Sequence, residues 1–262
     1  MPNRTPHTAF VTGGGTGLGR AVALRLAREG RPVCIASRNP AHLEPTRAEI
    51  EALGVPALAV PTDVRDLEQV RAAVERAERE LGPIGVLVNN AAGNFVVRAE
   101  DLTPNGWRAV VEIVLYGTWW CTQTVGRRML ERGRGAIVNV IATYAWTGMA
   151  GVVHSASAKG GVLAMTRSLA VEWGPRGVRV NAVAPGIMLT EGASRNLGFA
   201  DAATQERLRE AIPLRRFASV DEIAAAVAYL ASDEASYVNG ECLVIDGGAW
   251  LGRPGFAPPP GS

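Results

Sequence analysis

The sequence predicts an α/β protein: a single-domain, doubly wound (Rossmann-type) parallel sheet of about seven strands with helices on both faces. Seven short apolar runs alternate with helical patterns along the 262 residues. The runs are almost continuously apolar, which is typical of parallel strands covered on both faces. The first run leads through a glycine-rich turn directly into a helix, and this length suits one domain. We therefore expect residues 1–262 to form one domain.

Composition argues against several classes of partner. The net charge is +2 with dispersed charges, so neither nucleic acid nor a membrane surface is expected as a partner. No apolar run approaches the roughly 18 residues that span a bilayer, and Met1–His7 does not resemble a signal peptide. The three cysteines, Cys34, Cys121 and Cys242, lie in apolar surroundings without metal-ligand spacing. We interpret them as reduced core residues of a cytoplasmic protein and expect no metal site.

The first strand–turn–helix unit is the strongest local signal. An apolar run at Thr8–Val11 precedes the turn Thr12–Gly19 and the helical pattern Arg20–Ala27. Glycines let the backbone approach a pyrophosphate, and the helix N-terminus stabilises its charge, whereas the alternative is a plain tight turn. The cofactor contacts expected here are Gly13, Gly15, Thr16, Gly17, Leu18 and Gly19.

The end of the second strand indicates which dinucleotide binds. Pro32–Ala36 is followed by Ser37 and Arg38. A carboxylate at this place would bind the ribose 2′-hydroxyl of NAD, whereas a hydroxyl and an arginine suit the 2′-phosphate of NADP. We therefore expect NADPH/NADP; the alternative is a solvated arginine in a loop.

The next two strands end in polar or small residues. Ala57–Val60 leads to Asp63, which is placed to accept from the adenine amino group, and to Asp66, which we interpret as a helix cap. Ile84–Val88 leads to Asn89–Phe95. Its small residues permit close approach to a ligand, and its asparagines can tie strand ends together.

The second half of the chain continues the alternation. A long helix is expected from Pro104 to Glu131, with Trp119–Trp120 packing at an oligomer face or in the core rather than under a ligand. A strand at Val178–Ala184 is followed by Pro185–Ile187. Because a Pro-Gly turn follows this strand, we again expect a loop at the end of a strand.

The last part holds a long irregular connection. Residues 188–216 are polar and broken, with a helical patch near Gln205–Ala211, and we expect a substrate or lid loop. Ser219–Glu222 predicts a capping box that opens a helix. Cys242–Ile245 is the last expected strand, and 253–262 is a Pro-rich tail.

Lys159 is the only lysine among 27 lysines and arginines. Arginine never deprotonates, whereas lysine is a compact charge whose pKa burial can lower. Ser155 precedes it by four residues on one expected helix face, and Tyr144 follows the apolar run Gly135–Ile141, an expected buried strand. Two hydroxyls beside an ammonium favour proton transfer; the alternative is one stray lysine in an arginine-rich composition.

Several motifs resemble the short-chain dehydrogenase/reductase family over about Thr8 to Gly248. They are Thr12-Gly-x-x-x-Gly17-x-Gly19, Asp63-Val64, Asn89-Asn90-Ala91-Ala92-Gly93, Val180-Asn181 and Pro185-Gly186. The resemblance implies a homotetramer. It also implies cofactor contacts at Ser37, Arg38, Asp63, Val64, Asn90, Ala91, Ala92, Lys159, Pro185, Gly186 and Ile187.

The departures from that family are informative. Most members carry a catalytic tyrosine four residues before the lysine, a serine thirteen residues earlier and an asparagine on the preceding helix. Here these positions hold Ser155, Ala142 and Val114. An ordinary alcohol or ketone active site is therefore not expected.

Four segments instead resemble the 2,4-dienoyl-CoA reductase branch: Asn94-Phe95, Ala142–Ala145, Ser155–Lys159 and Glu172–Gly174. In that branch NADPH delivers hydride to C5 of a 2,4-dienoyl thioester, and protonation at C2 gives a 3-enoyl-CoA of fatty acid beta-oxidation. The resemblance implies an acyl-CoA substrate and the roles of the catalytic residues. Tyr144 would donate to the thioester oxygen, Lys159 would hold the nicotinamide ribose, and the Ser155 hydroxyl would lie beside them.

The remaining site residues follow from the same resemblance. Arg65 matches a position that meets the CoA part, with a surface cation as the alternative, and Asn94 and Phe95 are expected to contact substrate. Tyr116 stands where the branch places an asparagine, the second donor to the oxygen. Either the site is remodelled for another activated alkene, or Tyr116 rotates away and leaves Tyr144 alone.

Two other functions stay open at this stage. One is a biosynthetic reductase of another enone or carbonyl substrate. The other is a non-catalytic NADP-binding protein that keeps the fold without the chemistry. Retention of the sole lysine, Lys159, argues against the second.

Overall fold

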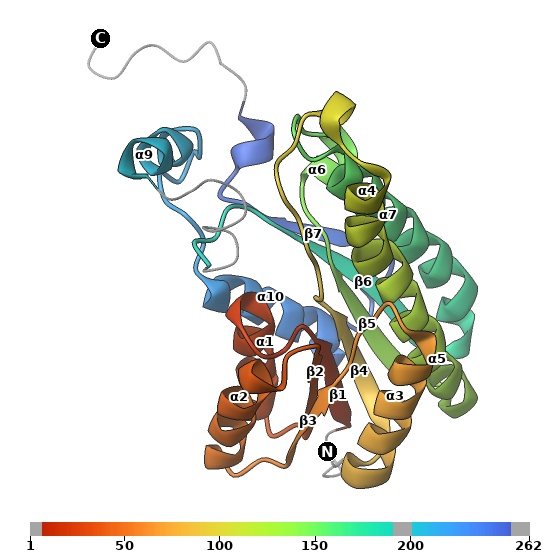
Figure 1. The fold of residues 1–262 in the computed structure, drawn as a ribbon. Helices are drawn as coiled ribbons and strands as arrows, with labels where there is room; N and C mark the ends of the chain where they lie inside the picture. Colours follow the sequence, from red (N-terminus) through yellow and green to blue (C-terminus); the bar gives the residue numbers. More distant parts are fainter. Residues whose placement is uncertain (1–6, 191–200, 253–262) are drawn as a thin grey trace.

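The seven strands form one parallel sheet. The computed structural model describes residues 7–190 and 201–252, and its strand order is β3-β2-β1-β4-β5-β6-β7 (Figure 1). Every neighbouring pair is parallel. This confirms the predicted fold class. The strands are β1 Thr8–Thr12, β2 Val33–Ser37, β3 Ala57–Pro61, β4 Ile84–Asn89, β5 Gly135–Val140, β6 Val178–Pro185 and β7 Cys242–Ile245.

Helices cover both faces of the sheet (Figure 1). One layer contains α1 Gly17–Arg28, α2 Pro40–Ala52 and α10 Val220–Ala231. The other contains α3 Leu67–Leu81, α4 Pro104–Val111, α5 Gly117–Arg132 and α7 Val153–Trp173. The shorter helical pieces are η1 Ala99–Asp101, η2 Glu112–Tyr116, α6 Tyr144–Thr147, η3 Gly174–Arg176, α9 Ala202–Glu210, η4 Asp233–Ala235 and η5 Ala249–Leu251.

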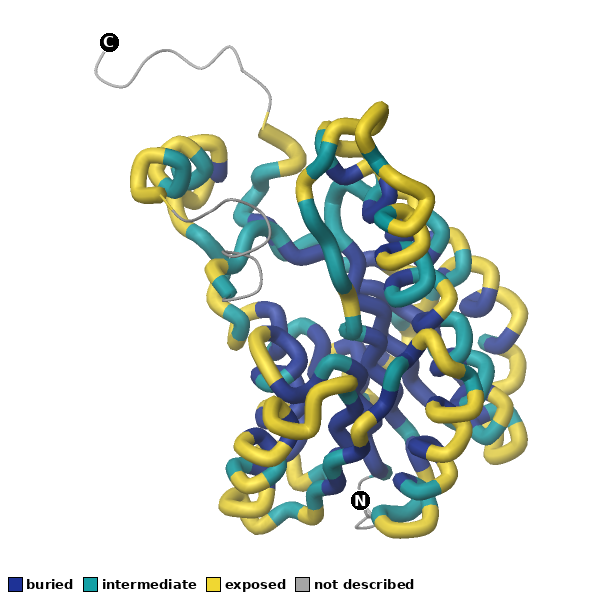
Figure 2. The backbone as a smooth tube through the Cα atoms, in the orientation of Figure 1, coloured by how far each residue is buried: buried dark blue, intermediate teal, exposed yellow. Residues whose placement is uncertain are grey.

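The core follows from the alternation of side chains along buried strands. In β1, Ala9 and Val11 pack against the α1–α10 layer, while Phe10 packs against the opposite layer. In β4, Val86 and Leu87 divide between the layers in the same way. Because both faces are covered, both sets are apolar, and the buried residues run through the sheet between exposed helix surfaces (Figure 2).

Most helix boundaries agree with the sequence signals. Ser219 caps α10 in a capping box with Glu222, as predicted, and Asp66 caps α3 by accepting from two backbone N–H groups. The first helix begins at Gly17, earlier than the pattern from Arg20 indicates. The long helix expected over 104–131 differs more, because a π-helical segment, η2, separates α4 from α5.

The three cysteines, Cys34, Cys121 and Cys242, are buried and unpaired, as expected. Burial raises the pKa of the Cys121 thiol to about 12, so it stays a neutral core residue. None of the helices within 7–190 and 201–252 is long and apolar enough to cross a bilayer.

Parallel strands place all their carboxyl ends at one edge of the sheet, and the chain reverses its winding between β1 and β4. Ligands of open α/β sheets bind at this edge. The connection 188–216 begins there with Met188 bridging to Ala218, and it contains α9. Residues 191–200 of that connection and the tail 253–262 lie outside the described residues.

Candidate active site

The glycine turn forms a tight cradle at the end of β1. Gly13 has φ +64° and Gly17 has φ +52°, a backbone conformation that side chains rarely adopt. A Cβ on Gly13 would lie 2.8 Å from the Asn90 amide nitrogen, and one on Gly19 would lie 2.0 Å from the Gly13 carbonyl oxygen. Helix α1 has no acidic residue in its first turn, so Thr16, Gly17 and Leu18 present an N-terminus suited to an anion.

Asn90 ties the glycine turn to the end of β4. Its Nδ2 donates to the carbonyl oxygens of Thr12 at 3.0 Å and Gly13 at 3.3 Å. The Thr12 hydroxyl oxygen accepts from the backbone N–H of Asn90 and of Ala91, both at 3.0 Å. The small residues Ala91 and Ala92 therefore follow a rigid junction, which fits a cofactor that must lie close to the backbone.

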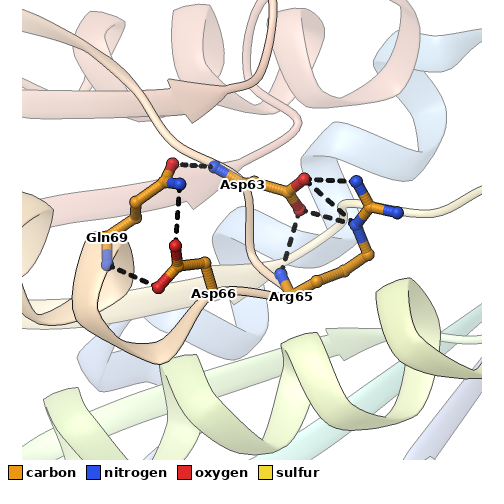
Figure 3. Close-up of polar contacts among 4 residues, drawn as sticks. All are labelled: Asp63, Arg65, Asp66 and Gln69. Atoms are coloured by element: carbon orange, nitrogen blue, oxygen red, sulfur yellow. Dashed lines mark hydrogen bonds and ion pairs between the residues drawn. The ribbon is translucent and has the colours of Figure 1, made fainter.

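Beyond the ends of β2 and β3, the carboxyl edge of the sheet carries two cations, Arg38 and Arg65, and one carboxylate, Asp63. The Asp63 carboxylate accepts from Arg65 Nε at 3.0 Å and Nη2 at 2.5 Å (Figure 3). This ion pair lowers the pKa of Asp63, and the charge of Arg38 lowers it further. Arg38, which follows Ser37 at the end of β2, is therefore close enough to act electrostatically on Asp63.

The loop between β3 and α3 is held on its other side as well. Gln69 Oε1 accepts from the backbone N–H of Asp63 at 3.0 Å, and Gln69 Nε2 donates to the Asp66 carboxylate (Figure 3). Val64 is buried, and a Cβ on Gly117 would lie 2.6 Å from its Cγ2. The loop that carries Asp63 and Arg65 is thus held by its own hydrogen bonds and by packing.

Tyr144, Ser155 and Lys159 meet at the ends of β5 and α7. The Tyr144 Oη and Ser155 Oγ are 3.0 Å apart in a hydrogen bond. Strand β5 ends at Val140, one residue before the predicted end, and Tyr144 follows it, as expected, as the first residue of the short helix α6. Burial raises the pKa of the Tyr144 phenol, and its bond with Ser155 only partly opposes this. The phenol is therefore protonated at neutral pH and can donate.

Lys159 is buried one helical turn beyond Ser155. Its side chain is only 7% exposed, and Nζ donates to the Val140 carbonyl oxygen at 2.5 Å. Burial lowers the pKa of its ammonium group to about 8, so the charged form still predominates at neutral pH. Since Val140 is the one acceptor of Nζ within 7–190 and 201–252, two of its three N–H groups can serve a ligand.

At the end of β6, the backbone again packs closely, here between Gly186 and Asp246. The Gly186 N–H donates to the Ile245 carbonyl oxygen at 2.8 Å. A Cβ on Gly186 would lie 2.7 Å from the Asp246 backbone, so only glycine fits between Pro185 and Ile187.

The expected substrate residues do not all converge. Phe95 packs against His154 with ring centroids 4.5 Å apart, and the Asn94 Oδ1 accepts locally from the Phe95 N–H. Tyr116 closes the π-helical segment and is 51% exposed. Over 7–190 and 201–252 it forms no hydrogen bond with Tyr144 or Ser155.

Sequence reasoning missed two polar features beside the site. Asn139, inside the apolar strand β5, accepts from Asn89 at 2.8 Å and donates to Thr166 at 2.9 Å, which joins β4, β5 and α7. An amide within an apolar run was the available signal. His154, next to Ser155, is fully buried, neither ring nitrogen has a hydrogen-bond partner among the described residues, and burial lowers its pKa. Nothing in the sequence distinguished it.

Three features together define a Rossmann-type dinucleotide-binding protein. They are the glycine turn after β1, the hydrogen bonds that tie Asn90 to that turn, and the close packing of Gly186 against Asp246. Comparison with known proteins agrees. Residues 13–249 match the family model described as enoyl-(acyl carrier protein) reductase. The chain therefore belongs to the short-chain dehydrogenase/reductase family, a class of oxidoreductases whose Rossmann-type fold binds NAD(P).

Three similar proteins indicate the relevant branch. A Bacillus subtilis protein named "Probable 2,4-dienoyl-CoA reductase", (2E)-enoyl-CoA-producing, is 46% identical over 92% of this chain and 96% of its own. The zebrafish (Danio rerio) peroxisomal 2,4-dienoyl-CoA reductase, (3E)-enoyl-CoA-producing, is 44% identical over 94% and 82%. The crystal structure of a short chain dehydrogenase from Bacillus anthracis is 44% identical with TM-score 0.88, covering 95% of this chain and 98% of that one.

Proposed function

We propose that this protein uses NADPH to reduce a conjugated C=C bond of a 2,4-dienoyl-CoA, giving a 3-enoyl-CoA. The observation that carries the proposal is the hydrogen bond between Tyr144 and Ser155, with the buried Lys159 one turn further on. This group offers a protonated phenol outside helix α7, while the helix itself carries a serine where a ketone reductase of the family needs tyrosine. The names of the two 2,4-dienoyl-CoA reductase relatives support the same substrate class.

The residues at the carboxyl edge fit a dinucleotide. The glycine cradle at Gly13–Gly19 and the gap at Gly186 admit backbone but no side chain, and helix α1 opens without an acidic residue. Lys159 has free N–H groups for ribose hydroxyls, and Arg38 adds a positive charge beside Asp63. When bound, NADPH supplies the hydride for the reaction.

Arg38 supports NADPH over NADH. Asp63 is already neutralised by Arg65, so the charge of Arg38 is left for a further anion. A ribose 2′-phosphate is such an anion, whereas the neutral 2′-hydroxyl of NADH gains little from a guanidinium.

The chain's own residues stabilise charge on the substrate. Reduction of the diene shifts negative charge to the thioester oxygen, and a preorganised donor there favours the transition state. Tyr144 is that donor in this proposal, with its phenol held by Ser155, and the Lys159 ammonium favours the same charge. Tyr116, on the facing helix, is the candidate for a second donor.

Arg65, Asn94 and Phe95 are proposed to meet the substrate. Arg65 lies at the end of β3, exposed enough to reach a CoA phosphate while paired with Asp63. The connection 188–216 would close over the acyl part, with α9 as its described helix.

The assay that tests the proposal is NADPH oxidation against a panel: 2,4-dienoyl-CoA, 2-enoyl-CoA, a simple ketone and a free enone. We expect turnover of the dienoyl-CoA and little with the ketone, because Ser155 replaces the phenol that would protonate an alkoxide. Chromatographic comparison with standards would distinguish the two possible products. Protonation at C2 gives 3-enoyl-CoA, whereas protonation at C4 gives 2-enoyl-CoA. Preferred turnover of the free enone or the ketone would replace the dienoyl-CoA proposal with a different reductase.

We also propose a cytoplasmic homotetramer. Three buried free thiols, Cys34, Cys121 and Cys242, fit a reducing compartment. Val171 on α7 is 79% exposed and Trp107 on α4 is 39% exposed, which fits a helical face covered by another copy. Light scattering after size-exclusion chromatography gives the assembly mass directly.

A further inference from the structure

Two tryptophans from distant parts of the chain meet beside the proposed active site. Trp146 lies on α6, two residues after Tyr144, and Trp250 lies in η5, the last described turn. Their rings are stacked, with centroids 5.8 Å apart and planes at 23°. The pair therefore joins the segment that carries the proposed oxygen donor to the segment that follows β7, and the two meet above the sheet edge (Figure 1).

Neither segment needs this stack to hold its backbone. The Asp246 carboxylate fixes η5 by accepting from the N–H of Gly248 at 2.9 Å and of Trp250 at 2.8 Å. Helix α6 is fixed by its own turn and by the bond from Tyr144 to Ser155. The stack is an added contact, formed where the backbone already brings two large rings together.

The pair also has apolar surroundings that face water. Trp250 is 45% exposed, and Leu251 beside it is 67% exposed. Leu214, which reaches Gly247 in the same region, is 63% exposed, and Met149, just after α6, is 56% exposed. Single exposed apolar residues are common, but a group at the mouth of a ligand-binding edge suits an apolar ligand.

The order of the strands gives the ligand a direction. Arg65 follows β3 at one edge of the sheet, Trp250 follows β7 at the other, and Tyr144 follows β5 between them. With the CoA part at Arg65 and the thioester at Tyr144, as proposed above, the acyl tail points toward the tryptophans.

We infer that the Trp146–Trp250 stack is the end wall of the acyl site and limits the length of the chain that fits. This inference rests on the proposed function for the direction of the substrate. The stack lies on the side of Tyr144 toward β7, which is the side the tail would take, and Trp250 is still 45% exposed. Removing one ring would therefore open the path without removing a group that touches the thioester.

Binding of saturated acyl-CoAs tests the wall without any reaction. Calorimetric titrations with chains of increasing length, in the presence of NADP⁺, should show wild-type affinity rising with length and then falling once the tail reaches the rings. In Trp250→Ala affinity should level off instead of falling, because the longer tail can pass the missing ring into solvent. Trp250→Phe, which keeps a ring, should stay close to wild type. Tyr237→Ala removes a fully exposed aromatic near the opposite, amino-terminal edge and is the matched control.

The kinetic arm compares 2,4-hexadienoyl-CoA with 2,4-decadienoyl-CoA. Trp250→Ala should raise the ratio of kcat/KM for the longer to the shorter substrate about tenfold, because the longer tail no longer has to displace the ring. Identical length profiles for wild type and Trp250→Ala, in binding and in turnover, would overturn the end wall. A wild-type enzyme that binds acyl-CoAs with the predicted length limit yet reduces neither dienoyl-CoA would instead overturn the proposed function and leave the wall supported.

Discussion

Tyr144 Oη and Ser155 Oγ lie 3.0 Å apart, joining the short helix after β5 to the first turn of α7. Ser155 is 1% exposed, so its hydroxyl cannot rotate freely into water. The serine thus holds the phenol in one orientation, and burial keeps that phenol protonated by raising its pKa. A fixed, protonated donor is what a developing oxyanion requires.

The first prediction concerns this pair. Tyr144→Phe should lower kcat about 10²–10³-fold, because one preorganised donor to an oxyanion is worth ~3–4 kcal/mol. Ser155→Ala should lower it less, since the phenol stays and only its orientation loosens. Steady-state NADPH oxidation with a dienoyl-CoA measures both, and circular dichroism checks the fold. A Ser155→Ala loss larger than that of Tyr144→Phe would assign the main donor role to the serine.

The second prediction is the dependence of stability on pH that Lys159 causes. Burial lowers its pKa from an ordinary 10.5 to about 8. Between these values the unfolded chain binds a proton that the folded chain does not, so stability rises with pH across this window and is constant outside it. The contribution is about 3 kcal/mol, as an order of magnitude.

Lys159→Met isolates this effect, because it removes the titrating group and keeps a side chain of similar length. Urea unfolding of the protein without cofactor, between pH 7 and pH 11, should show the wild type gaining about 3 kcal/mol relative to Lys159→Met as pH rises from about 8 to 10.5. Parallel profiles for the two proteins would mean that the ammonium is not desolvated in the fold.

The third prediction is cofactor choice at Arg38. A charge-assisted bond to the 2′-phosphate is worth about 1.5–3 kcal/mol, so Arg38→Ala should weaken NADPH binding roughly ten- to a hundred-fold. NADH binding should be almost unchanged. Arg71→Ala, an exposed arginine paired with Glu68 on α3, is the control. Calorimetric titration with both cofactors decides, and equal affinity of the wild type for NADPH and NADH would refute the assignment.

The fold was predictable because its signals are local and repeated. Each strand is a short apolar run, and glycines or helix caps such as Ser219 mark the boundaries. The π-helical segment that ends at Tyr116 was not predicted, because its residues continue an ordinary helical pattern. The wider turn lies where the helix packs against α7 and the β3–α3 loop, and such contacts are not visible in the sequence.

The site was predictable only in part. Sequence spacing placed Ser155 and Lys159 on one helix face, and the strand order then brought Tyr144 to them. The pairing of Asp63 with Arg65, two residues apart, depends on the conformation of their loop, and the stack of Trp146 on Trp250 joins two segments that are distant in sequence.

The last prediction concerns Tyr116, which stands where the related branch has an asparagine. Its ring is 51% exposed, and within the described ranges no hydrogen bond links it to Tyr144 or Ser155, so its phenol is free to turn toward a bound thioester or away from it. Tyr116→Phe removes the hydroxyl and keeps the ring.

If Tyr116 is the second donor, Tyr116→Phe should lose about 10²–10³ in kcat, and its effect should not simply add to that of Tyr144→Phe, because both phenols would serve one oxygen. Tyr116→Asn replaces the phenol by an amide donor and should keep or raise activity on a dienoyl-CoA. If instead Tyr116→Phe is harmless while Tyr116→Asn abolishes turnover, the ring is needed for the shape of the pocket. In that case Tyr144 alone donates to the oxygen, and the two-donor account is wrong.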